Sequence, residues 1–101
     1  RAQQAHLVAE HVRNSPYPVM ICGDFNETPL SYVYRILSAP LQDAFKQKGS
    51  GLGTTYAGKI PALRIDYILA DRRLKILDHQ ILYKSYSDHY PVRSSFEWPT
   101  Q

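Results

Sequence analysis

The stretch Val19-Met20-Ile21-Cys22-Gly23-Asp24-Phe25-Asn26 decides the fold of this 101-residue chain. Its first four residues are apolar, which is typical of a short β-strand buried on both faces, and Cys22 is expected to be a small buried hydrophobe. Gly23 lets the backbone leave the sheet at an angle that a Cβ would resist. Asp24 and Asn26 then lie on one side of the chain. An acid and an amide at the end of a rigid sheet suit a divalent metal and a phosphate.

Two later segments show the same design, Arg64-Ile65-Asp66-Tyr67-Ile68-Leu69 and Ser87-Asp88-His89-Tyr90-Pro91-Val92. Each joins an apolar strand to ionisable residues near a turn. Burying a carboxylate such as that of Asp66 is costly without a partner, so we expect a histidine, an arginine or a metal beside it. Taken singly, each ionisable residue also fits an ordinary turn or loop. Their recurrence at the ends of apolar strands favours a shared site.

The rest of the chain indicates two early helices followed by a run of strands. Apolar residues at helical spacing predict helices over residues 2–13 and 31–37, and alternating or β-branched stretches predict strands over 54–57, 64–70, 74–83 and 90–98. Residues 41–45 are expected to be a connector, 46–53 and 58–61 loops, and 71–73 a turn. This order is typical of an α+β fold or a layered sandwich.

Composition sets few limits on function. The net charge of +3, with 21% charged and 44% hydrophobic residues, is ordinary for a globular domain and compatible with an anionic substrate. A stand-alone nucleic-acid binder is disfavoured because no stacking platform or arginine-rich groove is evident. No apolar run approaches the roughly 18 residues of a membrane span, and no signal peptide is visible. The sequence predicts no localisation.

Three segments carry a resemblance to a known family. Gly-Asp-Phe-Asn at 23–26, Arg-Ile-Asp-Tyr-Ile at 64–68 and Ser-Asp-His-Tyr-Pro-Val at 87–92 resemble the last three signature segments of the endonuclease/exonuclease/phosphatase superfamily. That group includes deoxyribonuclease-like and abasic-site nucleases, neutral sphingomyelinases, inositol polyphosphate 5-phosphatases and deadenylases. The resemblance implies an α+β fold in which residues 1–101 form the C-terminal half of a four-layered α/β/β/α sandwich. One mainly antiparallel sheet would then be covered by helices on one face.

The resemblance also implies a role for each polar residue. Asp24 would orient or deprotonate the attacking water and touch a metal, with Asn26 holding the metal, the nucleophile or a phosphate oxygen. His89 would contact the scissile phosphate, as proton donor or as electrostatic stabiliser, and Asp66 would fix its tautomer. Asp88 would assist the metal. The implied chemistry is in-line hydrolysis of a phosphate ester with Mg²⁺, or Mn²⁺ as the alternative.

Two further residues are weaker candidates for substrate binding. Thr55-Tyr56 resembles the family's Thr-plus-aromatic strand near the rim of the active site, where Tyr56 would contact substrate, although a packed aromatic ring is the more ordinary interpretation of Tyr56. Arg64 either reaches a phosphate or pairs with a nearby carboxylate. Loop 46–53, where the family varies, is a third candidate for substrate contact.

The superfamily's principal metal-binding glutamate precedes the segments matched here. The chain begins at Arg1 inside a helical pattern with no cap, so we expect it to be the C-terminal part of a longer protein with little activity alone. The expected partners are a phosphate-ester substrate (nucleic acid, phosphoinositide or phospholipid head group) and either the missing N-terminal half or a second copy, bound through the apolar sheet face. A non-catalytic binding or assembly module on the same scaffold is the alternative function.

Overall fold

The computed structural model describes residues 2–25, 29–50, 53–57, 64–84 and 87–98. Three helices and five strands follow one another in these residues: α1 (Ala2–Asn14), β1 (Met20–Asp24), α2 (Tyr32–Ser38), β2 (Leu41–Asp43), α3 (Ala44–Lys48), β3 (Asp66–Asp71), β4 (Lys75–Ile81) and β5 (Val92–Glu97). None of the described helices is both long and apolar enough to cross a membrane.

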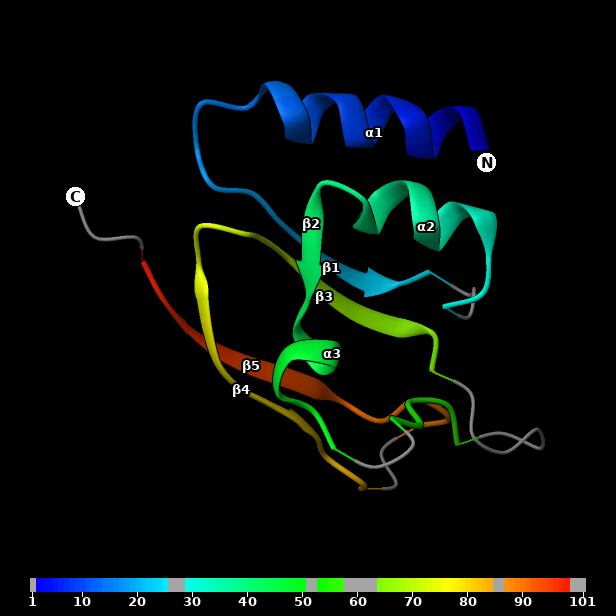
Figure 1. Ribbon diagram of the computed structural model, residues 1–101. Helices are drawn as coiled ribbons and strands as arrows, with labels where there is room; N and C mark the ends of the chain where they lie inside the picture. Colours follow the sequence, from blue (N-terminus) through cyan, green and yellow to red (C-terminus); the bar gives the residue numbers. More distant parts are fainter. Residues whose placement is uncertain (1, 26–28, 51–52, 58–63, 85–86, 99–101) are drawn as a thin grey trace.

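The strands form two antiparallel sheets. One has the order β1-β3-β2, and the other is a β4–β5 ribbon with an irregularity in register between Ile76 and Asp78. Figure 1 shows α1 and α2 on one side of β1 and β3, and the ribbon on the opposite side. The antiparallel pairing and the helical cover on one side confirm the predicted α+β fold, with the strands divided between two sheets.

β3 is the centre of the molecule because both of its faces are buried. Side chains alternate along a strand, so Tyr67 and Leu69 face one way and Ile68 and Ala70 the other. The first pair joins a core with α1, α2 and β2, made up of Ala5, Ala9, Tyr34, Ile36, Leu37 and Leu41. The second pair packs with Ala44, Leu74 and Ile76. The two predicted helices are present as α1 and α2, and the strands predicted over 64–70, 74–83 and 90–98 are present as β3, β4 and β5. The two cores meet on β3.

The prediction that β1 is buried on both faces, with Cys22 inside, is wrong. Met20 and Ile21 are half-buried, and Cys22 is exposed. β1 lies at the edge of its sheet. Partial burial still raises the pKa of the Cys22 thiol.

Residues 41–48 are more ordered than predicted. The expected connector contains β2, which pairs with β3 through Leu41 and Asp43, and the expected loop begins with α3. Asp43 begins that helix, because its side chain accepts a hydrogen bond from the Phe45 N–H at 3.0 Å. The strand expected over 54–57 is reduced to a single bridge between Tyr56 and His89. The loop predicted at 58–61 lies outside the described residues.

Candidate active site

Two aspartates enter the candidate site from neighbouring strands. β1 and β3 are antiparallel and in register, so Asp24 lies directly opposite Asp66. Residues paired in this way point to the same face of a sheet. Gly23 precedes Asp24 with φ +155°, a conformation that L side chains rarely adopt. No atom lies within 4 Å of where its Cβ would be, so the backbone conformation rather than crowding favours glycine.

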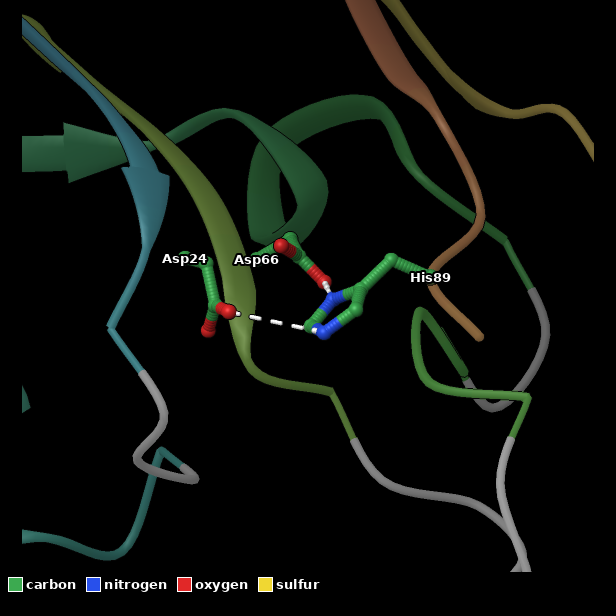
Figure 2. A group of neighbouring side chains, drawn as sticks. All are labelled: Asp24, Asp66 and His89. Carbon is green, nitrogen blue, oxygen red and sulfur yellow. Dashed lines mark hydrogen bonds and ion pairs between the residues drawn. The ribbon is translucent and has the colours of Figure 1, made fainter. Parts of the chain in front are cut away.

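His89 reaches both aspartates from the segment before β5. Its Nδ1 lies 2.9 Å from Oδ2 of Asp66, and its Nε2 lies 3.4 Å from Oδ2 of Asp24 (Figure 2). Ser87 holds the backbone of His89, because its Oγ accepts from the His89 N–H at 3.0 Å and donates to the His89 carbonyl at 3.1 Å. We call Asp24, Asp66 and His89 the His89 cluster.

The exposure of the side chains in the His89 cluster increases from Asp66 to His89 to Asp24. The side chain of Asp66 is 14% exposed, that of His89 30% and that of Asp24 44%. An ionised carboxylate only accepts hydrogen bonds, so Nδ1 of His89 carries the hydrogen that faces Asp66. This hydrogen bond raises the pKa of His89, against partial burial and with help from the charges of Asp66, Asp24 and Asp88. The arrangement therefore stabilises an imidazolium, whose Nε2 faces the more exposed carboxylate of Asp24.

The structure describes one of the other two residues predicted to hold a metal. Asn26 lies outside the described residues. Asp88 is exposed beside His89, and its backbone carbonyl accepts a hydrogen bond from the Ala57 N–H at 2.6 Å. In the described parts of the chain, the side chains that bring three potential metal-ligating atoms within 4.8 Å of one another are those of the His89 cluster.

Tyr56 lies against the imidazole of His89. The two residues form a backbone bridge, and their rings meet edge to face with centroids 5.5 Å apart. Tyr56 is half-buried. The ring therefore supports one side of His89, whichever of the two predicted roles it has.

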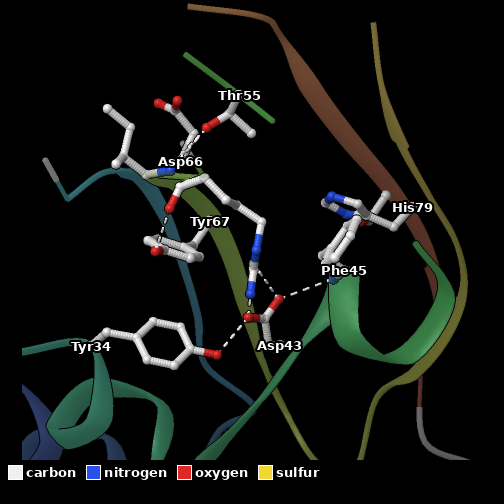
Figure 3. A network of polar contacts seen from close by, with 10 residues as sticks. Tyr34, Asp43, Phe45, Thr55, Asp66, Tyr67 and His79 are labelled. Atoms are coloured by element: carbon white, nitrogen blue, oxygen red, sulfur yellow. Dashed lines mark hydrogen bonds and ion pairs between the residues drawn. The ribbon is translucent and has the colours of Figure 1, made fainter. Parts of the chain in front are cut away.

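Arg64 points into the protein interior rather than toward the His89 cluster. Its guanidinium pairs with Asp43 at 2.9 Å and lies over the rings of Phe45 and Tyr67, 4.7 and 4.8 Å from their centroids. Figure 3 labels these three neighbours, Asp43, Phe45 and Tyr67. The side chains of Arg64 and Asp43 are only 8% and 3% exposed. Of the two roles considered for Arg64, the structure shows the pairing with a carboxylate.

Asp43 is the buried centre that the sequence reasoning missed. Besides Arg64, it accepts a hydrogen bond from the Tyr34 hydroxyl at 2.6 Å. Burial and this hydrogen bond raise the pKa of Tyr34 to about 12, so the hydroxyl stays protonated and donates. We call Tyr34, Asp43, Phe45, Arg64 and Tyr67 the Asp43 network. The signal that could have found it was a carboxylate between apolar neighbours, the same signal that singled out Asp66.

The comparisons with known proteins agree with this fold. The family model of the endonuclease/exonuclease/phosphatase family matches residues 1–89. The chain belongs to that family. No curated protein sequence matches the chain significantly.

Solved structures of two Bacteroides species share the fold. A mannosyl-6-phosphatase of Bacteroides thetaiotaomicron superimposes with a TM-score of 0.80 at 21% identity, covering 96% of this chain and 45% of its own. An endonuclease/exonuclease/phosphatase of Bacteroides vulgatus gives a TM-score of 0.82 at 25% identity, covering 96% and 43%. The chain therefore spans less than half the length of the structures that it matches.

Proposed function

We propose that this chain forms part of a metal-dependent phosphoesterase, which hydrolyses a phosphate ester by in-line attack of water. The observation that carries the proposal is the alignment of Asp66, His89 and Asp24, in which one carboxylate orients an imidazole and a second carboxylate faces its other nitrogen. Family membership supports the reaction class. The substrate class stays open, because one site of this kind serves many substrates.

Each residue of the His89 cluster has a distinct task in this proposal. Asp24, the most exposed of the three, orients the attacking water and accepts its proton. His89 faces the phosphate with its Nε2 side, where a protonated ring donates a proton or stabilises the developing negative charge. Asp66 holds the Nδ1–H and favours the charged form of the ring. Asn26, outside the described residues, would hold a phosphate oxygen.

The donor set near Asp24 fits Mg²⁺, or Mn²⁺ as the alternative. Magnesium takes oxygen ligands and is usually held by one or two carboxylates together with substrate phosphates. Asp24 offers an exposed carboxylate, Asp88 is exposed beside His89 in the sequence, and Asn26 would add an amide oxygen. Asp66 is less suited, because Oδ2 is already bonded to His89. When bound, the metal supplies positive charge that neutralises the phosphate.

Replacing His89 tests this proposal directly. The assays use the full natural polypeptide that contains these residues, with Mg²⁺ and a panel of DNA, RNA, phosphoinositide, phospholipid and sugar-phosphate substrates. We expect His89→Ala to lower kcat by about 10²–10⁴-fold, the usual contribution of a positioned acid or base. His11→Ala is the matched control, since His11 is exposed on α1. Unchanged hydrolysis in His89→Ala would favour the alternative, a non-catalytic binding or assembly module.

An open apolar hollow beside the His89 cluster motivates the proposed partner. It has a volume of about 440 Å³ and is lined by Cys22, Ile68, His89, Pro91 and Val92, among others. We propose that the remainder of the polypeptide, or a second copy of this chain, covers it, and that the 101-residue chain alone has little or no hydrolase activity. A monomeric 101-residue chain in sedimentation would contradict the second copy as the partner. Mg²⁺-dependent turnover of a phosphodiester by this chain would contradict the expected lack of activity.

A further inference from the structure

Thr55 is a buried polar residue that the proposed mechanism does not use. It is 1% exposed and lies in the short segment between α3 and β3, next to Tyr56. That segment forms no regular strand in the described residues. It nevertheless runs between the segment that contains Asp66 and the segment that contains His89. A threonine this deeply buried needs partners for its hydroxyl.

Thr55 forms hydrogen bonds with both of these segments. Its Oγ1 accepts hydrogen bonds from the backbone N–H of Ile65 at 2.9 Å and of Asp66 at 3.1 Å (Figure 3). Its carbonyl oxygen accepts from the N–H of Tyr90, the residue after His89, at 2.7 Å. One residue therefore joins the backbone of Asp66 to the backbone beside His89.

Neighbouring backbone bonds tie the same region together. The N–H of Ala57 donates to the carbonyl of Asp88 at 2.6 Å, so the chain is held on both sides of His89. The N–H of Phe25 donates to the carbonyl of Ile65 at 2.9 Å, which holds the chain that follows Asp24. Thr55 thus lies where the backbones of all three residues of the His89 cluster are connected.

The chemistry of threonine matters at this position. β2 pairs with residues 69–71 of β3 and does not extend to Ile65 and Asp66, so β2 offers no carbonyl to these two N–H groups. The hydroxyl oxygen has two lone pairs and takes the place of that missing strand. Valine has the same shape but no acceptor, and it would leave two buried donors unpaired.

We propose that Thr55 is a positioning residue, which sets the distance between the Asp66 carboxylate and Nδ1 of His89 by bonding the backbones of both segments. Its catalytic consequence rests on the proposed phosphoesterase function, whereas the geometric claim does not. Thr55 touches neither the proposed substrate nor the metal. It acts through the placement of Asp66 and His89.

Three variants of the full natural polypeptide test the proposal. Thr55→Val removes the acceptor, Thr55→Ser keeps it, and Thr54→Val is the matched control at the preceding threonine. We expect Thr55→Val to lower kcat by about 10–100-fold with KM changed by less than about 3-fold, because small misplacements of catalytic groups cost rate. Thr55→Ser and Thr54→Val should stay within about 3-fold of the unmodified protein. Wild-type kcat in a folded Thr55→Val would overturn the proposal.

Two spectroscopic measurements separate this proposal from the proposed function. In ¹⁵N-histidine-labelled protein, the downfield Hδ1 resonance of His89 should be visible, persist in Thr55→Ser and be lost or shifted in Thr55→Val. In the unmodified protein, the amides of Ile65 and Asp66 should be protected from hydrogen exchange. This measurement tests the two hydrogen bonds to Thr55 even if Thr55→Val does not fold. Fast exchange of both amides, or an unchanged Hδ1 resonance in Thr55→Val, would refute the positioning role. If the Hδ1 resonance and the amide protection are as expected but the protein hydrolyses none of the substrates, the result would contradict the proposed function and leave the positioning role in place.

Discussion

Two ionic groups lie near the beginning of β3, and they differ in almost every respect. The Asp43 network is closed, with its central arginine and aspartate 8% and 3% exposed. The His89 cluster is open, with His89 30% and Asp24 44% exposed. Arg64 and Asp66 are only two residues apart in the sequence, yet their side chains serve different groups. The difference in exposure indicates that one group supports the fold and the other can meet a ligand.

In the Asp43 network the bonding capacity of the carboxylate is used within the protein. Oδ1 accepts from Phe45 N–H and from Arg64, and Oδ2 accepts from the Tyr34 hydroxyl and pairs with Arg64. A buried ion pair of this kind gives structure but leaves nothing for a ligand. In the His89 cluster the inner side is bonded and the outer side faces solvent. We infer that the first group maintains the fold and the second carries the proposed function.

The largest effect on stability should come from breaking the Asp43 network. Arg64→Met leaves the Asp43 carboxylate buried without its cation, which typically costs about 3–5 kcal/mol in the free energy of unfolding. Chemical denaturation of the variant measures this loss. The double variant Arg64→Met/Asp43→Leu should recover part of it, because no uncompensated charge remains.

Arg73 supplies the control for that experiment. It makes an ion pair with Asp71 at 2.8 Å, but its side chain is 51% exposed. Exposed pairs contribute about 0–1 kcal/mol, so Arg73→Met should change the free energy of unfolding far less than Arg64→Met. Equal losses in the two variants would remove the distinction between a closed network and a surface pair.

Breaking the His89 cluster should affect chemistry more than stability. In the full natural polypeptide, Asp66→Asn should lower kcat by about 10–100-fold, the usual cost of losing a carboxylate that orients a functional imidazole. The pKa of His89 should fall, because its hydrogen bond to Asp66 is the largest cause of the raised value. NMR titration of the His89 ring measures the shift. Asp78→Asn on β4 is the control, and a His89 pKa that is the same in Asp66→Asn and in the unmodified protein would contradict the assignment.

The sequence predicted the strands and their polar ends better than it predicted their surroundings. Asp24 ends β1, Asp66 begins β3 and His89 lies shortly before β5. The register of β1 against β3 brings the two aspartates opposite each other. β2 was missed because three residues are too few to show a period, and their strand conformation depends on pairing with the distant β3. Cys22 was misjudged because burial depends on what covers a sheet, which local sequence does not encode.

The role of Arg64 could not be settled from sequence for a related reason. Its partner Asp43 lies 21 residues earlier, in a segment taken to be a connector. The bonding of Thr55 could not be predicted from sequence either, because it depends on two backbone N–H groups that a neighbouring strand would normally satisfy. Sequence motifs identify the candidate catalytic residues. Contacts between residues far apart in the sequence determine which other residues hold them in place.

A smaller effect should come from the helix that carries Tyr34. Ser31 caps α2, and its Oγ accepts from the Tyr34 N–H at 3.0 Å. Ser31→Ala should lower the free energy of unfolding by about 1 kcal/mol, whereas Ser31→Asp should retain the cap. Thermal unfolding of both variants checks this. No loss in Ser31→Ala would mean that packing of Tyr34 against Asp43 holds the helix end without the cap.

The finest test of the comparison uses two histidines whose pKa values move in opposite directions. His79 lies on β4 near the Asp43 network, with its ring edge against Phe45 and Nδ1 2.6 Å from Ser94 Oγ. Burial lowers the pKa of His79; the charge of Arg64 adds to this, while those of Asp43 and Asp78 oppose it. As pH falls below the ordinary histidine value of about 6.5, the unfolded state takes up this proton first, so His79 reduces stability on acidification.

His89 acts in the opposite sense. Because its folded-state pKa is raised, it contributes stability at pH below its unfolded value and loses that contribution as pH rises through the folded value. We therefore expect the free energy of unfolding of His79→Asn to fall less than that of the unmodified protein between about pH 7.5 and about pH 5, a range that brackets the ordinary histidine pKa. His89→Asn should lose more. Chemical denaturation at a series of pH values measures both differences, and identical pH profiles for the two variants would mean that the closed and open groups do not differ in how they hold a proton.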